Sequence, residues 1–309
     1  MSRTLLIAFI SAVLLIAVPA KSAAQDDAGR FHHVHLNVMD TNATVRHYVK
    51  FFSAVPVKFR GVSDALLTDR SYLLLNKVES APNTETLTSL WHIGWGGVDG
   101  PSEFKWRTDQ GIEWETGIQS LGRSHYMYAY GPDREIVEIF TGTPYNRYNH
   151  IHLLAKDINV TRDWYIDNLG AKGRKNHIPN PGNPPAEMDR TSPAMFRYLW
   201  ATSVQVDGVT VNIFEAPGAG PVWWWQGEPV PELAKTDGHA IDHYAFSYTN
   251  IAPVYERMKA NGVEIVKDIE WNEELKMKSF FVRAPDGVLV EIVEANPLPE
   301  ASWMGQDTP

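Results

Sequence analysis

The segment YNHIHLLAKDIN (148–159) joins a short apolar strand to a residue that can cap a helix. Strand side chains alternate between faces, so His150 and His152 share one face, and Asp157 then precedes the amphipathic stretch NVTRDWYIDNLG. Three other segments share this outline: FHHVHLNVMDTN (31–42), LWHIGWGGVDGP (90–101) and AIDHYAFSYTNI (240–251). In all four, an Asp or Asn follows a histidine by seven positions, which indicates a fourfold internal repeat.

Three strand-like stretches follow each helical stretch, with a weaker helix pattern in the second repeat. The last strands read SYLLLNKVES (71–80), REIVEIFTG (134–142), GVTVNIFEAP (208–217) and GVLVEIVEAN (287–296). The sequence therefore predicts four β-α-β-β-β units. We expect consecutive units to pair, giving a first domain over 31–147 and a second over 148–297.

Aligned first strands place four histidines in one column: His33, His92, His150 and His243. Aligned last strands give a second column: Asn76, Glu138, Asn212 and Glu291. Consecutive pairing then predicts two metal-binding triads, namely His33 with His92 and Glu138, and His150 with His243 and Glu291. Two imidazoles and one carboxylate suit a divalent ion that must also bind substrate, and we interpret the two asparagines as outer-shell groups. The second triad is the expected working site. The alternative is that one of the two triads is a degenerate remnant that has only a structural role.

Two further histidines share a strand face with a predicted ligand. His35 lies two residues after His33, as His152 does after His150, whereas His32 is expected to point away. His35 and His152 are therefore candidates for outer-shell partners or proton carriers, and the alternative is a polar residue that bonds a neighbouring strand.

The repeated units, the column of histidines and the ending PDG-x-x-x-E resemble the vicinal oxygen chelate superfamily of glyoxalases, bleomycin-resistance proteins and extradiol dioxygenases. The resemblance implies an α+β fold, in which four βαβββ modules pair into two domains whose cup-shaped mixed β-sheets surround a metal. It favours Fe(II), with Mn, Zn or Ni as alternatives. Tyr128 matches a catalytic tyrosine of the extradiol pattern, but Phe281 stands there in the second pair, and neither pair has the complete acid–base set.

We therefore expect a metal-dependent dioxygenase that cleaves a small aromatic diol. A glyoxalase-like lyase or isomerase, or a non-enzymatic protein that sequesters a ligand or metal, remains the alternative. Trp223, Trp224 and Trp225 lie in an insert at 216–240 and could wall an aromatic ligand, pack the insert onto the sheet or form a homodimer contact. A proline-rich stretch at 176–193 is predicted to be a surface loop.

Composition excludes several classes of function. The net charge is −9 with no basic run, which argues against nucleic-acid binding. The chain has no cysteine, so disulfides and thiolate metal sites are excluded. It also lacks a P-loop, a dinucleotide fingerprint and a serine-nucleophile elbow.

The N-terminus predicts export, either to a periplasm or as a secreted protein, with no membrane association after processing. Arg3 precedes an apolar run and then small residues up to Ala24, which is the layout of a signal peptide over 1–24. Residues 25–30 and the tail 298–309 are expected to be loose. Mass spectrometry of the exported protein should find Gln25 at its N-terminus, and an intact Met1 or Ser2 would contradict this prediction.

Overall fold

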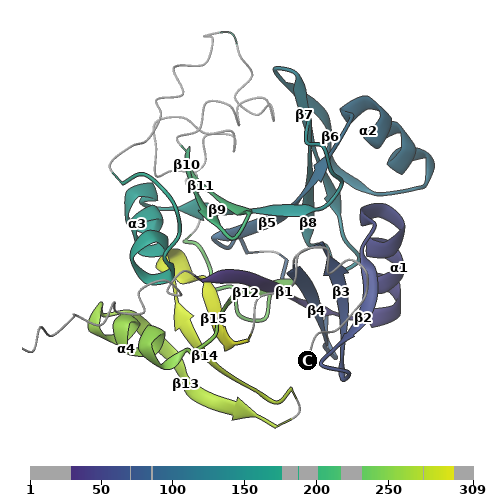
Figure 1. The fold of residues 1–309 in the computed structure, drawn as a ribbon. Coiled ribbons are helices and arrows are strands. Elements are labelled where there is room, and N and C mark those ends of the chain that lie inside the picture. The colour runs from purple at the N-terminus through teal and green to yellow at the C-terminus, as the bar shows by residue number, and fades with distance from the viewer. Residues whose placement is uncertain are drawn as a thin grey trace, which may run out of the picture.

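The computed structural model describes residues 29–69, 71–84, 86–175, 187, 201–216, 232–273 and 275–295. Within them the chain forms two mixed β-sheets and four α-helices (Figure 1). The predicted α+β fold of βαβββ modules is confirmed. The signal peptide, the tryptophan run at 223–225 and almost all of the loop at 176–193 lie outside the described residues.

The first sheet has eight strands and takes its strands from the first and fourth repeat units. Their spatial order is β13 (Glu264–Asn272), β14 (Met277–Arg283), β15 (Leu289–Glu294), β12 (Ile241–Tyr248), β1 (Arg30–Val38), β4 (Ser71–Lys77), β3 (Ser63–Thr68) and β2 (Val55–Phe59).

The second sheet has seven described strands and takes them from the second and third units. Their spatial order is β10 (Ala201–Val206), β11 (Val209–Glu215), β9 (Tyr148–Ala155), β5 (Leu90–Gly97), β8 (Ile136–Thr141), β7 (Ser124–Tyr130) and β6 (Trp114–Leu121).

This topology corrects the predicted pairing of consecutive units. At the centre of the first sheet β1 pairs with β12, and at the centre of the second β5 pairs with β9, antiparallel in both cases. The domain boundary predicted between 147 and 148 therefore lies between β8 and β9, which both belong to the second sheet. Local patterns specify each unit, but they do not specify which first strands pair, because all four carry a similar alternation of apolar and polar residues.

Three of the four helices begin directly after the predicted cap residue, and the fourth begins two residues after Asn250, with Ile251 at its cap position. They span α1 (Thr41–Phe52), α2 (Gly100–Asp109), α3 (Ile158–Leu169) and α4 (Ala252–Ala260). The carboxylates of Asp40, Asp99 and Asp157 each accept a hydrogen bond from a backbone N–H of the first turn, which satisfies an otherwise unpaired donor. None of these helices is long and apolar enough for a membrane span, within the residues that the structure describes.

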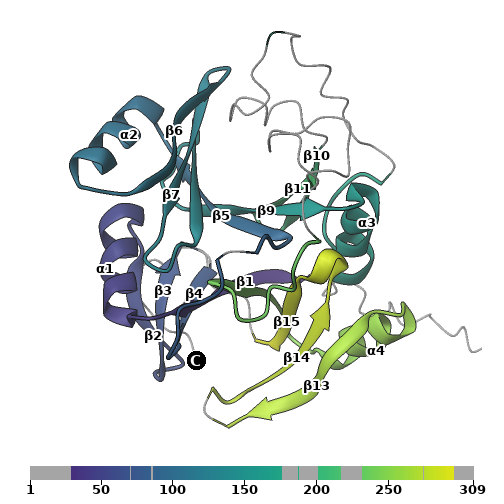
Figure 2. The same cartoon turned by 180° about the vertical axis from the view of Figure 1, so that it is seen from behind.

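One apolar core joins the two sheets. Val34 and Leu36 of β1 belong to the same buried cluster as Ile93 of β5 and Ile151 of β9. Because strand side chains alternate, the remaining residues of these strands face away from this core, on the concave side of each sheet. The two cups therefore open in different directions, and Figure 2 shows the sheets as separate layers with α1 and α3 at opposite sides.

The helices also connect one sheet to the other. The Trp95 indole of β5 donates a hydrogen bond to the Phe52 carbonyl of α1, at 3.1 Å. On the opposite side, the hydroxyl groups of Tyr165 in α3 and Tyr244 in β12 are hydrogen-bonded. α1 and α3 each contact strands of their own sheet, and each also makes a hydrogen bond to a strand of the other sheet, which connects the two cups.

Glu135 lies in the turn before β8 and is a buried acid at this junction. It accepts hydrogen bonds from the Tyr48 hydroxyl of α1, at 2.9 Å, and from the Asp133 backbone N–H, at 3.0 Å. Burial raises the pKa of Glu135 from 4.5 to about 7, although these hydrogen bonds oppose the rise.

Replacement of Glu135 should therefore change how stability depends on pH. The unfolded chain loses this proton near pH 4.5 and the folded chain near pH 7, so the free energy of unfolding falls as pH rises between these values. Glu135→Gln removes this loss. At pH 8 the free energy of unfolding of the variant should therefore exceed that of the wild type by up to about 3 kcal/mol. Urea titrations at pH 4.5 and pH 8 measure the difference, and a difference that is equal at both pH values would refute the assignment.

Candidate metal centres

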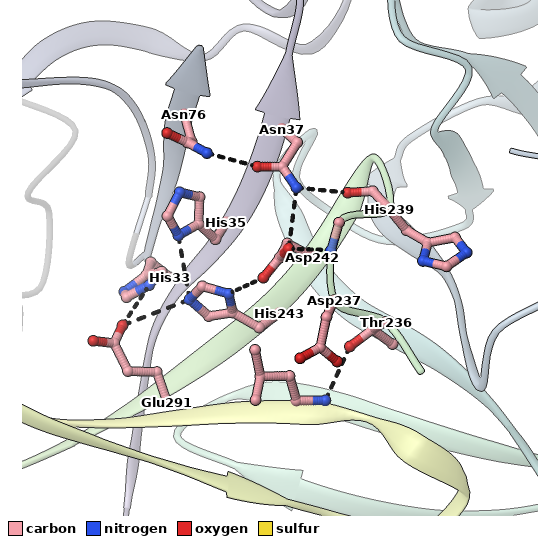
Figure 3. Close-up of polar contacts among 12 residues, drawn as sticks. His33, His35, Asn37, Asn76, Thr236, Asp237, His239, Asp242, His243 and Glu291 are labelled. Carbon is pink, nitrogen blue, oxygen red and sulfur yellow. Dashed lines mark hydrogen bonds and ion pairs between the residues drawn. The ribbon is translucent and has the colours of Figure 1, made fainter. Parts of the chain in front are cut away.

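Four side chains converge on the concave face of the first sheet, and we call them the first-sheet site: His33, His35, His243 and Glu291 (Figure 3). Glu291 Oε2 lies 3.2 Å from His33 Nε2 and 3.7 Å from His243 Nε2. His35 Nδ1 lies 3.2 Å from the same His243 Nε2. The ligand-capable nitrogens of the three histidines all lie within 4.8 Å of one another.

The second sheet holds the corresponding set, the second-sheet site: His92, Glu138, His150 and His152. Glu138 Oε2 lies 2.9 Å from His150 Nε2 and 3.2 Å from both His92 Nε2 and His152 Nε2. All four side chains are buried. In each sheet, the first strand of one unit gives two histidines, and the other unit gives one histidine and the glutamate.

The strand register explains why these side chains meet. His35 lies opposite His243 in the β1–β12 pair, and His92 lies opposite His152 in the β5–β9 pair. Residues opposite each other in a sheet project from the same face. Glu138 pairs with Gly94, and a Cβ at Gly94 would lie 1.9 Å from His150 Nε2, so only glycine leaves room for this imidazole.

The carboxylates are ionised in both sites. Burial alone would raise the pKa of Glu138, but the charge interaction with His152 and hydrogen bonds from His150 and His92 hold it well below the usual value. Burial likewise opposes a low pKa for Glu291, and His243 and His33 again lower it. Burial lowers the pKa of His92, His152 and His33, which favours the neutral imidazole that binds metals.

His243 differs from the other histidines. Burial would lower its pKa, but hydrogen bonds to Asp242 and Glu291 raise it to about 9. Asp242 Oδ1 lies 2.6 Å from His243 Nδ1. A metal bound at Nε2 would therefore have to displace a proton from this ring.

These donor sets fit a divalent metal. Three imidazoles and one carboxylate form a nitrogen-rich set of the kind that binds Fe, Zn, Ni or Cu, and it leaves two positions of an octahedron for other ligands. Glu138 Oε1 is buried and has no hydrogen-bond partner among the described residues, as expected for an oxygen placed to bind an ion. The two groups are thus candidate sites for a divalent metal of open identity.

The second-sheet site also borders a cavity of about 520 Å³. Glu138, His150 and His152 form part of its wall, and Asn212 lies beside them. The other lining residues are Phe140, Thr143, Pro144, Tyr145, Arg147, Asn149, Gly208, Thr210 and Phe214. A small molecule in this cavity would therefore be in contact with the candidate ligands.

The predicted grouping of the ligands is wrong, although each predicted ligand does lie in a His/Glu cluster. His150 and His243 belong to different sheets, as do His33 and His92, so neither predicted triad forms. The number of candidate ligands in each pair of units could not reveal the true grouping, because consecutive pairing would also give three histidines and one glutamate per pair. Metal binding by these residues remains a prediction, and so does the assignment of activity to one of the two sites.

The other predicted site residues occupy distinct positions. His35 and His152 join the candidate ligands, and Asn212 Nδ2 lies 2.8 Å from His152 Nε2. Asn76 instead donates a hydrogen bond from Nδ2 to Asn37 Oδ1, at 2.8 Å. The Tyr128 ring lies 5.1 Å from the His92 ring.

The expectation for His32 is wrong. A register shift between Phe31 and His33 interrupts the strand alternation, and His32 Nδ1 lies 2.8 Å from His33 Nδ1 instead of pointing away. Sequence reasoning also missed Asp242 and Asn149, which directly precede His243 and His150 and contact their rings. A polar residue directly before an aligned histidine was the available signal.

Paired substitutions should reveal the grouping of the ligands. Glu291→Ala should remove one equivalent of bound divalent metal per chain, and adding His33→Ala should remove no more, because both residues serve one site. Adding His150→Ala to Glu291→Ala should instead remove a second equivalent. Elemental analysis after dialysis gives the stoichiometry. The grouping is disproved if the His33 and His150 double variants lose the same amount of metal.

Comparisons with known proteins agree with this architecture. Residues 147–292 match the family model of the Glyoxalase/Bleomycin resistance protein/Dioxygenase superfamily. A search of curated proteins finds no match.

Solved structures match most of the chain. Glyoxalase I from Zea mays aligns with a TM-score of 0.65 and 15% identity, over 86% of this chain and 92% of that one. A putative dioxygenase from Bacillus subtilis aligns with a TM-score of 0.58 and 10% identity, over 91% and 89%. At such identities the likeness concerns the fold alone. Residues 147–292 therefore resemble this superfamily, and the chain as a whole shares the fold of glyoxalase I.

Proposed function

We propose that this protein is a metal-dependent dioxygenase that acts on a small aromatic diol at the second-sheet site. The main support is one atom: Glu138 Oε2 has the Nε2 atoms of three imidazoles at 2.9–3.2 Å, beside a cavity. A single carboxylate oxygen surrounded by three imidazole nitrogens is an arrangement suited to a shared cation.

Two aromatic residues in the lining of the cavity favour an aromatic ligand. Phe140 and Phe214 lie two residues beyond Glu138 and Asn212 on their strands, so they project from the same face as these residues. The Phe214 ring stacks on the His152 ring, with centroids 4.9 Å apart. A planar ring could pack between these aromatic side chains while its oxygens reach the candidate ligands.

The first-sheet site has different surroundings. Its neighbours on the concave face include Tyr72, Leu74, Ala245 and Val293, which form a buried apolar cluster with Phe59 and Met277. For this reason we assign turnover to the second sheet.

The surrounding residues would orient the ligands and move protons. A divalent ion at this site would stabilise negative charge on a substrate oxygen. Asn212 Nδ2 lies 2.8 Å from His152 Nε2, the same ring nitrogen that faces Glu138. The Tyr128 hydroxyl is buried without a hydrogen-bond partner among the described residues, and it could exchange a proton with a diol beside His92.

A glyoxalase-like lyase or isomerase is the second candidate. With His35 and His152 among the candidate ligands, each site offers four protein donors, and fewer positions remain for substrate and dioxygen together. Sequestration of a ligand or metal without turnover is the third reading. The N-terminal sequence supports a further proposal, that the protein acts outside the cytoplasm.

Oxygen uptake separates these activities. The protein is loaded with Fe(II) without air, mixed with a panel of catechols, and followed in an oxygen electrode and by absorbance of the ring-cleavage product. Glu138→Gln should lower kcat by more than about 100-fold, because it removes the anionic ligand rather than an outer-shell partner. The matched variant Glu291→Gln should retain most of the activity.

Equal oxygen uptake by Glu138→Gln and the wild type would rule out the second-sheet site. Rearrangement of a substrate without oxygen uptake would favour the lyase or isomerase. Tight binding of catechols or metal with no turnover under any condition would favour sequestration.

A further inference from the structure

The two candidate metal sites differ in the groups that contact the histidine ring nitrogens facing away from the site. On the first sheet, Asp242 Oδ1 lies 2.6 Å from His243 Nδ1, the ring nitrogen that faces away from the site. The corresponding strand of the second sheet is β5, since it also supplies the single histidine of its site. There Trp91 precedes His92, and the two rings lie 4.4 Å apart.

In the second-sheet site, no carboxylate contacts the Nδ1 atoms of His92 and His150 among the described residues. His92 Nδ1 is buried and has no hydrogen-bond partner in the described part of the chain. His150 Nδ1 contacts Asn149 Oδ1 at 2.5 Å, which is an amide and carries no charge. Asn149 also lines the cavity.

Asp242 is held in place by a chain of hydrogen bonds (Figure 3). Its Oδ2 accepts from the Gly238 backbone N–H at 2.7 Å and from Asn37 Nδ2 at 3.0 Å. Asn37 Oδ1 in turn accepts from Asn76 Nδ2 at 2.8 Å, and Asn37 Nδ2 also reaches the His239 carbonyl at 3.0 Å. Both carboxylate oxygens of Asp242 are thus occupied, so the His243 ring has one orientation, with Nε2 facing Glu291 and His35.

A carboxylate behind a histidine strengthens its bond to a metal. It raises the basicity of the imidazole and fixes the ring before the ion arrives, and loss of such a partner commonly costs 10–100-fold in metal affinity. An amide such as Asn149 can orient the ring but adds no negative charge.

We propose that Asp242 is a positioning residue that makes the first-sheet site the tighter of the two metal sites. The first sheet then keeps a resident divalent ion, while the second sheet carries an exchangeable ion next to the cavity where substrate binds. This inference rests on the proposed function only in so far as both sites bind divalent ions, and it does not depend on which reaction occurs.

Single-site variants allow each affinity to be measured in the full chain. Glu138→Ala leaves the first-sheet site and Glu291→Ala leaves the second, and competition with a chromophoric chelator gives the Kd of each for Zn²⁺. The first-sheet site should have the lower Kd. Asp242→Asn in the Glu138→Ala chain should raise the Kd by about 10–100-fold. It should also shift the visible absorption bands of bound Co²⁺, which report the ligand field.

The reciprocal change provides the matched test and does not rely on a destabilised variant. Asn149→Asp in the Glu291→Ala chain places a carboxylate behind His150, so it should lower the Zn²⁺ Kd of the second-sheet site. Thermal melting of the metal-free variants shows whether each remains folded.

Three outcomes would overturn the inference: a second-sheet site that binds Zn²⁺ as tightly as the first, an unchanged Kd in Asp242→Asn together with an unchanged Kd in Asn149→Asp, or no Zn²⁺ binding at either site. The absence of Zn²⁺ binding at both sites would also argue against the proposed function. Unequal sites that respond as expected, in a protein without oxygen uptake, would support this inference and reject the dioxygenase proposal alone.

Discussion

The antiparallel pairing of first strands, β1 with β12 and β5 with β9, is the interaction on which both candidate sites depend. Each ligand set draws on two repeat units, and this pairing places the two histidines of β1 beside His243 and the two histidines of β9 beside His92. The parallel neighbours β15 and β8 then bring Glu291 and Glu138 beside these histidines. A slip of one residue in either central pair would move the histidines of one strand to the core face and abolish the site.

The pairing also imposes a cost that a bound ion would offset. Each site holds an ionised glutamate among imidazoles, buried for Glu138 and partly buried for Glu291, and burial alone opposes the charge on both. Hydrogen bonds from the histidines compensate in part, but they require protons on rings that are themselves buried. A divalent cation would replace those protons and bind all four donors, so the folded chain should be more stable with metal than without it.

Much of the fold could be predicted from the sequence, because it is encoded locally. The alternation through His150 and His152 defines a strand, and Asp40, Asp99 and Asp157 cap the helices where the pattern predicts. The partner of each unit could not be predicted, since strand pairing across more than 200 residues leaves no local signal, as between His35 and His243. Outer contacts such as that of Asp242 depend on the same long-range pairing, and for His32 a local bulge overrides the alternation.

We infer that the chain holds two separate four-donor metal centres, one on each sheet. Anomalous X-ray diffraction at the absorption edge of the bound metal, from crystals of the metal-loaded protein, tests it most directly. Two anomalous peaks per chain are expected. One should be bonded to His33, His35, His243 and Glu291, and the other to His92, Glu138, His150 and His152. A peak bonded to both His150 and His243, or the absence of any peak at these histidines, would contradict it.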